Sequence, residues 1–285
     1  MSTTSFIPKQ AQEALAVGPA AIWKELRGYL SDELACYLLT LAPPITATSK
    51  IHDNGCGSGA VSRAVMELNP PSGAHVDATD RDAAALAELE EAVVANSWPV
   101  GTEVMDSTKL TFADGNFDLS ITNMVFAAFT KGSEDAQAAE EIKRTLKPGG
   151  LAIANAFHHN PRNTVILDAH HAVHGKEAAP LPAMYFAYYH SSDFKKALED
   201  AGWDNVRYVD SDVWVEIEDL QRFANVVWAV TGQPSTGWTE EDEQNWDKAI
   251  STIITGLQKG KGKWFIEKDG THRVRMIVTT ALLQK

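Results

Sequence analysis

Short apolar segments alternate with longer amphipathic segments over residues 50–157, and this alternation predicts the secondary structure. The apolar segments are bounded by Gly, Pro, Asn or Asp, as strands usually are. We predict strands in KIHD, AHVDATD, TEVMD, FDLSITNMVF and LAIANAF. We predict helices in AVSRAVMEL, DAAALAELEEAVVAN and EDAQAAEEIKRTL, where apolar residues recur at helical spacing. Strands that alternate with helices in this way favour a doubly wound, mostly parallel α/β sheet.

The segments on either side of this region are also patterned. Residues 20–42 place leucines at helical spacing, and Pro43 and Pro44 end the predicted helix. After Phe157 the alternation ends, and residues 158–190 contain six histidines and the aromatic run MYFAYYH. The elements predicted after this region are a helix at 191–203, a strand at 205–215, helices at about 218–231 and 239–258, and a strand at 271–283.

The segment IHDNGCGSGAVSRAV places Gly55, Gly57 and Gly59 between a predicted strand and a predicted helix. Glycines allow a tight turn and let another molecule approach the backbone closely, so this arrangement is typical of a cofactor site. The spacing differs from the G-x-G-x-x-G of dinucleotide-binding proteins, and no G-K-[ST] of a phosphate-binding loop follows. Asp53, just before the turn, would also repel a pyrophosphate.

Acidic residues end three successive predicted strands, at Asp53, Asp80 and Asp106. The carboxyl ends of parallel strands meet at one edge of a sheet, so we expect these side chains to line one crevice. Asp53 suits a ligand with a positively charged end, such as the amino acid part of S-adenosylmethionine. An ionised carboxylate has two acceptor oxygens, so Asp80 can accept hydrogen bonds from ribose hydroxyls and Asp106 from an adenine amino group. The three acids together suit S-adenosylmethionine as a ligand.

At these positions the chain resembles the class I S-adenosylmethionine-dependent methyltransferases. The resemblance rests on DNGCGSG at 53–59, VDATDRD at 76–82, VMDSTKLTFADGNFDLSITNMVF at 104–126 and IKRTLKPGGLAIANAF at 142–157. It implies a Rossmann-like, seven-stranded sheet and methyl transfer as the activity. It also implies cofactor contacts at Cys56, Arg81, Ser107, Asn123 and Met124, with Cys56 contributing only its backbone.

We predict a single methyltransferase domain over residues 1–285. Its parts are an N-terminal helical cap at 1–48, a cofactor-binding half at 49–157 and an acceptor-side half with inserted helices at 158–285. Parallel sheets bind ligands beyond the carboxyl ends of their strands. The N-terminal and inserted helices are therefore expected to form a lid over the crevice.

Within the family, the chain looks like small-molecule enzymes of the ubiquinone/menaquinone-biosynthesis type. Its N-terminal helices and the segment GWTEEDEQNWDKAISTII resemble fungal secondary-metabolite enzymes, which implies S-methylation of a thiol or dithiol, as in the gliotoxin type. Residues 123–126 lack the N-P-P-[YF] pattern of enzymes that methylate amines or bases. Open alternatives are O- or C-methylation of a phenol- or quinone-type metabolite, and a regulatory protein that binds the cofactor without turnover. The glycine spacing disfavours a third alternative, an NAD-dependent oxidoreductase.

The acceptor side contains candidate residues but no assigned catalytic base. His158 and His159 follow the strand LAIANAF and are the candidates, because histidine can take up a proton near neutral pH. The aromatic candidates for acceptor binding, which are also compatible with core packing, are Trp23, Tyr29, Phe126, Phe157, Tyr185 and Tyr189. We predict no metal site, because His170, His171 and His174 lack a Cys or Glu at ligand spacing.

The formal net charge of −13 disfavours a nucleic-acid substrate, which would need clustered Lys and Arg. The run KGKGK at 259–263 is expected to be a solvated turn. We therefore predict a small-molecule acceptor, with no obligate protein partner. Cys36 and Cys56 are predicted to be free thiols. With no signal-peptide pattern and no run of about 18 apolar residues, the sequence predicts a cytoplasmic protein that does not enter a membrane.

Overall fold

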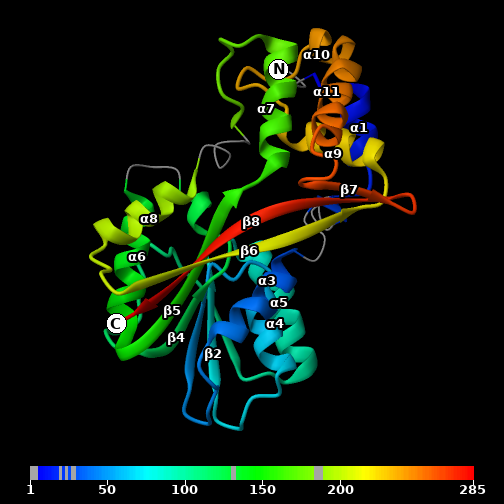
Figure 1. Ribbon diagram of the computed structural model, residues 1–285. Helices are drawn as coiled ribbons and strands as arrows, with labels where there is room; N and C mark the ends of the chain where they lie inside the picture. The colour runs from blue at the N-terminus through cyan, green and yellow to red at the C-terminus, as the bar shows by residue number, and fades with distance from the viewer. Residues whose placement is uncertain (1–5, 19–20, 23–24, 27–29, 130–132, 183–188) are drawn as a thin grey trace, which may run out of the picture. The chain divides into compact units, whose positions relative to one another are not determined.

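The computed structural model describes residues 6–18, 21–22, 25–26, 30–129, 133–182 and 189–285 (Figure 1). The chain forms two compact units, which we call the helical unit and the sheet unit. The helical unit consists of Met1–Leu30, His159–Tyr189 and Asp212–Ile277. The sheet unit consists of Ser31–His158, His190–Ser211 and Val278–Lys285. The sheet unit thus includes two segments of the predicted acceptor-side half, and the predicted single domain stays a prediction.

The strands are hydrogen-bonded in the order β3-β2-β1-β4-β5-β8-β6. Their bounds are β1 (Lys50–Asn54), β2 (His75–Asp80), β3 (Val100–Val104), β4 (Phe117–Thr122), β5 (Leu146–His159), β6 (Val206–Ile217) and β8 (Thr271–Gln284). The pairs β1–β2, β1–β4, β2–β3 and β4–β5 are parallel. This topology confirms the predicted doubly wound, mainly parallel α/β fold.

An additional strand, β7 (Phe265–Lys268), pairs with β8 in antiparallel orientation, so the sheet of the described residues has eight strands instead of the seven predicted. The hairpin turn is Asp269-Gly270, and both residues have positive φ, 53° and 79°. Two positive φ values are what a type I′ turn requires, and Asp-Gly is one of its preferred dipeptides. The turn was therefore visible in the sequence, although the strand before it was too short to predict.

Helices flank the sheet of the sheet unit. They are α3 (Leu30–Leu41), α4 (Ala60–Glu67), α5 (Ala83–Asn96), α6 (Glu134–Thr145) and α8 (Ser191–Asp200), with a short 3₁₀ helix at Phe126–Ala128. Figure 1 shows α3, α4 and α5 along one side of the sheet and α6 and α8 along the other. Asp82 starts α5 as the pattern predicts, since its carboxylate accepts the N–H of Ala84 at 2.9 Å. Between the sheet and these helices lie apolar residues such as Ile51, Val76 and Leu89.

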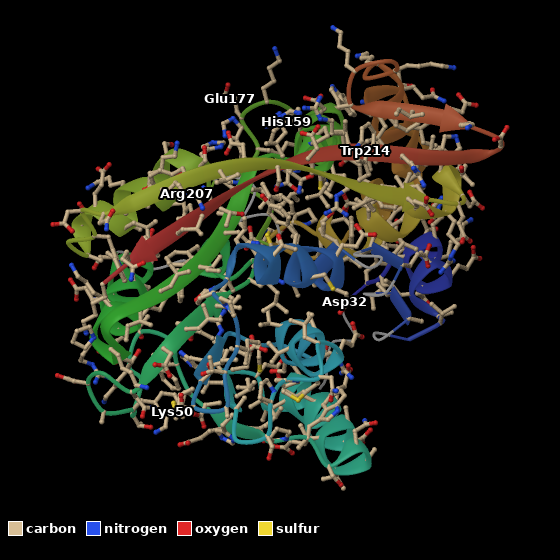
Figure 2. All side chains as sticks on the ribbon, turned by 60° about the horizontal axis from the view of Figure 1, so that its bottom comes forward. Asp32, Lys50, His159, Glu177, Arg207 and Trp214 are labelled. Carbon is tan, nitrogen blue, oxygen red and sulfur yellow. The ribbon has the colours of Figure 1, made fainter. Side chains whose placement is uncertain are left out.

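Strand register brings the predicted acidic residues to one edge of the sheet. Asn54 at the end of β1 pairs with Thr79, and Asp80 at the end of β2 pairs with Val104 at the end of β3. Asp106 lies in the loop that follows. Lys50 starts β1 at the opposite edge (Figure 2), where its N–H donates to Asp118 at 2.9 Å. The acidic residues therefore lie where parallel sheets bind ligands.

The helical unit contains α1 (Lys9–Leu15), α7 (Pro161–His174), α9 (Leu220–Thr231), α10 (Glu240–Gln244) and α11 (Trp246–Gln258). The tryptophans Trp228 and Trp246 are almost fully buried in its core. Helix α7 was not among the predicted elements. It begins at Pro161, a residue that helices tolerate in the first turn, and the Asn160 side chain caps it by accepting the N–H of Arg162 at 3.2 Å. The predicted lid role of these helices stays a prediction.

Across the described part of the chain, no helix is both long enough and apolar enough to cross a membrane.

Candidate functional site

The chain after β1 makes a turn that only glycines adopt readily. Gly55, Gly57 and Gly59 all have positive φ, at 68°, 54° and 91°. The N–H groups of Gly55 and Cys56 donate to the carbonyl of Thr79 at 2.8 and 2.9 Å, which fixes the turn against the end of β2. A side chain at Gly55 would meet Val125 at 2.5 Å, whereas a side chain at Gly57 would meet nothing within 4 Å. The turn therefore leaves open space beside Gly57.

Asp80 lies next to this open space. One of its carboxylate oxygens accepts the N–H of Gly57 at 2.8 Å, and the other accepts the N–H of Asp82 at 2.9 Å. Each carboxylate oxygen has more than one acceptor position, so a partly exposed Asp80 retains capacity for hydroxyl donors of a ligand. This geometry fits the predicted contact with a ribose.

Asp53 is almost fully buried, and its contacts differ from the expected ones. Its Oδ2 accepts both the N–H of Ser62 at 2.9 Å and the hydroxyl of Ser62 at 2.7 Å. Burial raises the pKa of Asp53 to about 6 against the effect of these bonds, and the Asp80 carboxylate adds to the rise. Asp53 thus ties β1 to the first turns of α4, and its contact with a cofactor stays a prediction.

Asp106 is exposed and keeps its negative charge. Its Oδ1 accepts the N–H of Thr108 at 2.9 Å and the Thr108 hydroxyl at 2.8 Å, and these bonds lower its pKa. Arg81, another predicted site residue, lies near enough to lower that pKa further. An ionised carboxylate that accepts from an amino group is what the predicted adenine contact requires.

Ser107 is held by a residue that the sequence reasoning missed. Its hydroxyl donates to Oδ1 of Asn54 at 2.9 Å, and Nδ2 of Asn54 donates to Thr122 at 3.2 Å. Asn54 is completely buried, so its amide needs such partners. The signal was present, since Asn54 stands between the strand-end acid and the glycine turn.

Asn123 and Met124, the predicted site residues after β4, are fixed by a second missed residue. Asn155 in β5 accepts the N–H of Met124 at 2.6 Å and donates to the side chain of Asn123 at 3.0 Å. Asn123 in turn donates to the carbonyl of Ser31 at 3.0 Å. Met124 has a positive φ of 61°, a strained conformation for this residue type, and these bonds hold it. A buried polar residue inside the apolar run LAIANAF was the available signal.

Cys56 does not have the properties of a nucleophile. Its side chain is buried, and burial together with the carboxylates of Asp53 and Asp80 raises the pKa of the thiol far above its usual range. Cys56 and Cys36 are both free cysteines, as predicted. The backbone contact that the resemblance implies for Cys56 agrees with this chemistry.

The predicted acceptor residues occupy different environments. Phe126 is fully buried and packs edge-on against Phe194, with ring centroids 4.8 Å apart, so it belongs to the core. Phe157 and Tyr189 are half-buried. Trp23, Tyr29 and Tyr185 lie outside the described residues.

The two candidate bases belong to different units. His158, in the sheet unit, has its Nδ1 3.3 Å from the Ser191 hydroxyl, 3.4 Å from the Thr279 hydroxyl and 3.8 Å from a carboxylate oxygen of Asp210. Asp210 was not predicted, because β6 and β8 approach β5 only in the folded sheet. His159 belongs to the helical unit.

The histidines of α7 bond to one another and to the protein. Nδ1 of His170 lies 2.9 Å from Nδ1 of His174, and Nε2 of His174 lies 2.6 Å from the carboxylate of Asp242. Nε2 of His170 faces the carbonyl of Ala179 at 2.9 Å. All four ring nitrogens therefore have protein partners in the helical unit. Among the residues that the structure describes, no three His, Cys, Asp or Glu side chains are grouped to hold a metal ion.

A mainly parallel sheet with a glycine turn after its first strand and a carboxylate at the end of its second is the arrangement of a nucleotide-type cofactor site. Residues 52–154 match the family model described as Methyltransferase domain. The match agrees with the predicted enzyme class and with S-adenosylmethionine as the predicted cofactor.

Known proteins share this fold at low sequence identity. The protein YcgJ of Bacillus subtilis superimposes with a TM-score of 0.58 at 13% identity, over 89% of this chain and 98% of that chain. Phosphoethanolamine N-methyltransferase 2 of Haemonchus contortus, solved with S-adenosylhomocysteine, gives a TM-score of 0.54 at 14% identity, over 96% of this chain and 60% of that chain.

In sequence, the ribosomal RNA small subunit methyltransferase C of Shewanella loihica is 29% identical over 123 residues, which is 42% of this chain. The matched region spans 35% of that relative, about a third of its length.

The contrast between Gly55 and Gly57 gives a prediction. Gly55→Ala forces a methyl group against Val125 at positive φ, so it should lower the stability of the protein by about 1–3 kcal/mol. Gly57→Ala has the same backbone strain but no clash, so the protein should fold, while the methyl group occupies space needed by the cofactor. Thermal unfolding and calorimetric titration with S-adenosylhomocysteine separate the two effects. If the Gly57→Ala protein bound S-adenosylhomocysteine as tightly as the wild type, the glycine turn would not be part of the cofactor site.

Asp106 gives a prediction about recognition of the adenine ring. Asp106→Asn places an N–H₂ group either against the Thr108 donors or against the adenine amine, so affinity for S-adenosylhomocysteine should fall about tenfold. The inosine analogue, which has an acceptor in place of the amine, should bind the variant at least as well as the adenosine form does. Asp77→Asn, a variant outside this loop, is the control. Equal binding of both analogues by the wild type would contradict the adenine contact.

Proposed function

We propose that the protein is an S-adenosylmethionine-dependent methyltransferase that methylates a thiol of a small molecule. The observation that carries the cofactor half of this proposal is the position of Asp80, 2.8 Å from the N–H of Gly57 and beside open space. A ligand that enters this space meets backbone on one side and a carboxylate on the other. That environment suits a ribose diol next to a zwitterionic amino acid chain.

S-adenosylmethionine, when bound, supplies a methyl group on a positively charged sulfur, which an acceptor takes by in-line displacement. The protein has to bind both partners, orient them and exclude water. Asp80 and Asp106 accept hydrogen bonds from the adenosyl part. Asn155 holds the backbone of Met124 in place at the end of β4, where an acceptor would approach.

A small-molecule acceptor fits the charge of the chain. A net charge of −13 opposes binding of a phosphate backbone, whatever the substrate of the ribosomal RNA relative. The segment Asn123-Met124-Val125-Phe126 stands where amine-methylating enzymes have N-P-P-[YF], which disfavours an amine.

Among the candidate acceptors, a thiol depends least on a catalytic base. Its reference pKa of about 8.5 gives a useful thiolate fraction near neutral pH, so no strong base is needed. A phenol, with a reference pKa of about 10, depends more on a base. The contact of His158 with Asp210 favours the second candidate, O- or C-methylation of a phenol- or quinone-type metabolite, because a carboxylate can orient a histidine base.

Methylation assays with dithiols, phenols, catechols and amines, followed by mass spectrometry, test the proposal. With a thiol acceptor, His158→Ala and His159→Ala should keep most of kcat, and the rate should rise with pH as the thiol ionises. With a phenol, one of these variants should lose about 10²-fold in kcat. His75→Ala, at the other end of β2, is the matched control.

If phenols were methylated while dithiols did not react, the thiol assignment would be refuted. Binding of S-adenosylhomocysteine with no methylation of any acceptor would instead favour a regulatory protein that binds the cofactor without turnover.

A further inference from the structure

The helical unit contains a cavity that shares only one residue, the candidate base His159, with the proposed function. Its volume is about 400 Å³, within the range of small-molecule sites. The residues that line it are His159, Gly262, Lys263, Trp264, Arg275 and Ile277. They come from the end of β5, labelled at His159 in Figure 2, from the turn before β7 and from β8. None of them is among the predicted cofactor residues.

The charged side chains of this cavity are all basic. Arg275 donates to the carboxylate of Asp212 at 2.8 Å, but its Nε is buried and has no hydrogen-bond partner among the described residues. A buried donor without a partner is costly, and an anion in the cavity would satisfy it. The ammonium group of Lys263 takes part in no ion pair within the described residues. In a chain with a net charge of −13, this local excess of positive charge stands out.

One wall of the cavity is a fixed aromatic ring. The ring of Trp264 packs against the backbone of Gly260 so closely that a side chain at Gly260 would lie 2.3 Å from it. The carbonyl of Trp264 accepts the N–H of Arg275 at 2.7 Å, which holds the backbone of Trp264 beside that of Arg275 in β8. A flat apolar surface beside basic groups complements an aromatic molecule that carries a negative charge.

We propose that this cavity binds a small organic anion, with a carboxylate or phosphate held by Arg275 and Lys263 and a flat apolar body against Trp264. The run KGKGK then has a role beyond that of a solvated turn, since Lys263 reaches the ligand. The proposal does not depend on methyl transfer, because binding alone is asserted.

Calorimetric titration of the full chain with phenyl phosphate and, separately, with benzoate tests the site. We expect saturable binding of one of them at millimolar or lower concentration, and the tighter ligand identifies the anionic group. Benzyl alcohol, which lacks the charge, should bind at least tenfold more weakly. Lys263→Gln and Arg275→Gln should each weaken binding about tenfold or more. Lys263 is exposed, so its variant is expected to fold even if loss of the Arg275–Asp212 pair disturbs the unit.

Lys259→Gln is the matched control, because Lys259 carries the same charge on the same segment but does not line the cavity. The Lys259→Gln variant should bind both anions with the affinity of the wild type. Absence of saturable binding to both anions would overturn the proposal, and so would an equal loss in Lys259→Gln, which would indicate diffuse electrostatic attraction. Unchanged affinity in Lys263→Gln would also overturn it.

Discussion

Asp80→Ala should reduce the affinity for S-adenosylhomocysteine about a hundredfold or more. Two charge-assisted hydrogen bonds to ribose hydroxyls contribute about 1.5–3 kcal/mol each, and every 1.4 kcal/mol is a factor of ten. The variant also loses the acceptor of the Gly57 N–H, so the glycine turn loses its contact with the side chain at the end of β2. Calorimetry on the folded variant measures the change.

Two further variants show whether the loss comes from the ribose contact. Asp80→Asn keeps one acceptor oxygen, so its affinity should lie between those of Asp80→Ala and the wild type. Asp82→Ala removes the cap of α5, which costs about 1 kcal/mol of stability, but it leaves the Asp80 carboxylate in place. The affinity of Asp82→Ala for S-adenosylhomocysteine should be that of the wild type. If Asp80→Ala bound S-adenosylhomocysteine like the wild type, the proposed cofactor site would be refuted.

His52 should make the stability of the sheet unit fall as the pH falls below about 6.5. The ring is fully buried, is stacked on Phe117 with centroids 4.8 Å apart, and lies 2.9 Å from the hydroxyl of Thr79. Burial lowers the pKa of His52 to about 3. Between pH 6.5 and 3 the unfolded chain binds a proton that the folded protein excludes. Stability is therefore retained above pH 6.5 and lost by about 1.4 kcal/mol per pH unit below it, roughly 4–5 kcal/mol in total.

The neighbouring Asp53 acts in the opposite direction. Its pKa is raised to about 6 in the folded protein, so the folded state takes up a proton that the unfolded state lacks as the pH falls from about 7 to 4. The wild-type pH profile mixes both effects, and comparison with variants separates them. His52→Gln keeps a hydrogen-bonding group but does not titrate in this range.

Urea unfolding of the wild type and His52→Gln at several pH values between 7.5 and 4 checks the prediction. The variant should be less stable at pH 7.5, where it lacks the stacked ring, and more stable at pH 4, where the wild type is penalised. Asp53→Asn should steepen the loss of stability on acidification. Parallel pH profiles for the wild type and His52→Gln would mean that the ring is not kept neutral by burial.

The sequence predicts well where a short-range pattern determines structure. The glycine turn, the helix after it and the acid at Asp80 could be located because strand periodicity ends there and glycine signals positive φ. Helix α7 was missed because its buried face, which includes Val165 and Ile166, carries histidines as well as apolar residues, and this blurs the helical period.

Contacts between segments that lie far apart in the sequence could not be predicted from it. Asn155 reaches Met124 and Asn123 across neighbouring strands, and Asp210 reaches His158 only because β8 lies between β5 and β6. No periodicity encodes such pairings. The bonds of Ser62 to the Asp53 carboxylate, from nine residues later and from within the helix, were also not predicted.

The place of β8 in the sheet has a consequence for synthesis of the protein in the cell. Neither unit is a continuous stretch of chain, since the helical unit ends at Ile277 and the sheet unit includes residues from Val278 onward. While the ribosome is still making residues 160–270, β5 has an unpaired edge on the side that β8 will occupy. An exposed edge strand can pair with other chains. Nascent chains should therefore depend most on chaperones just before β8 emerges. A chain truncated before Thr271 should aggregate.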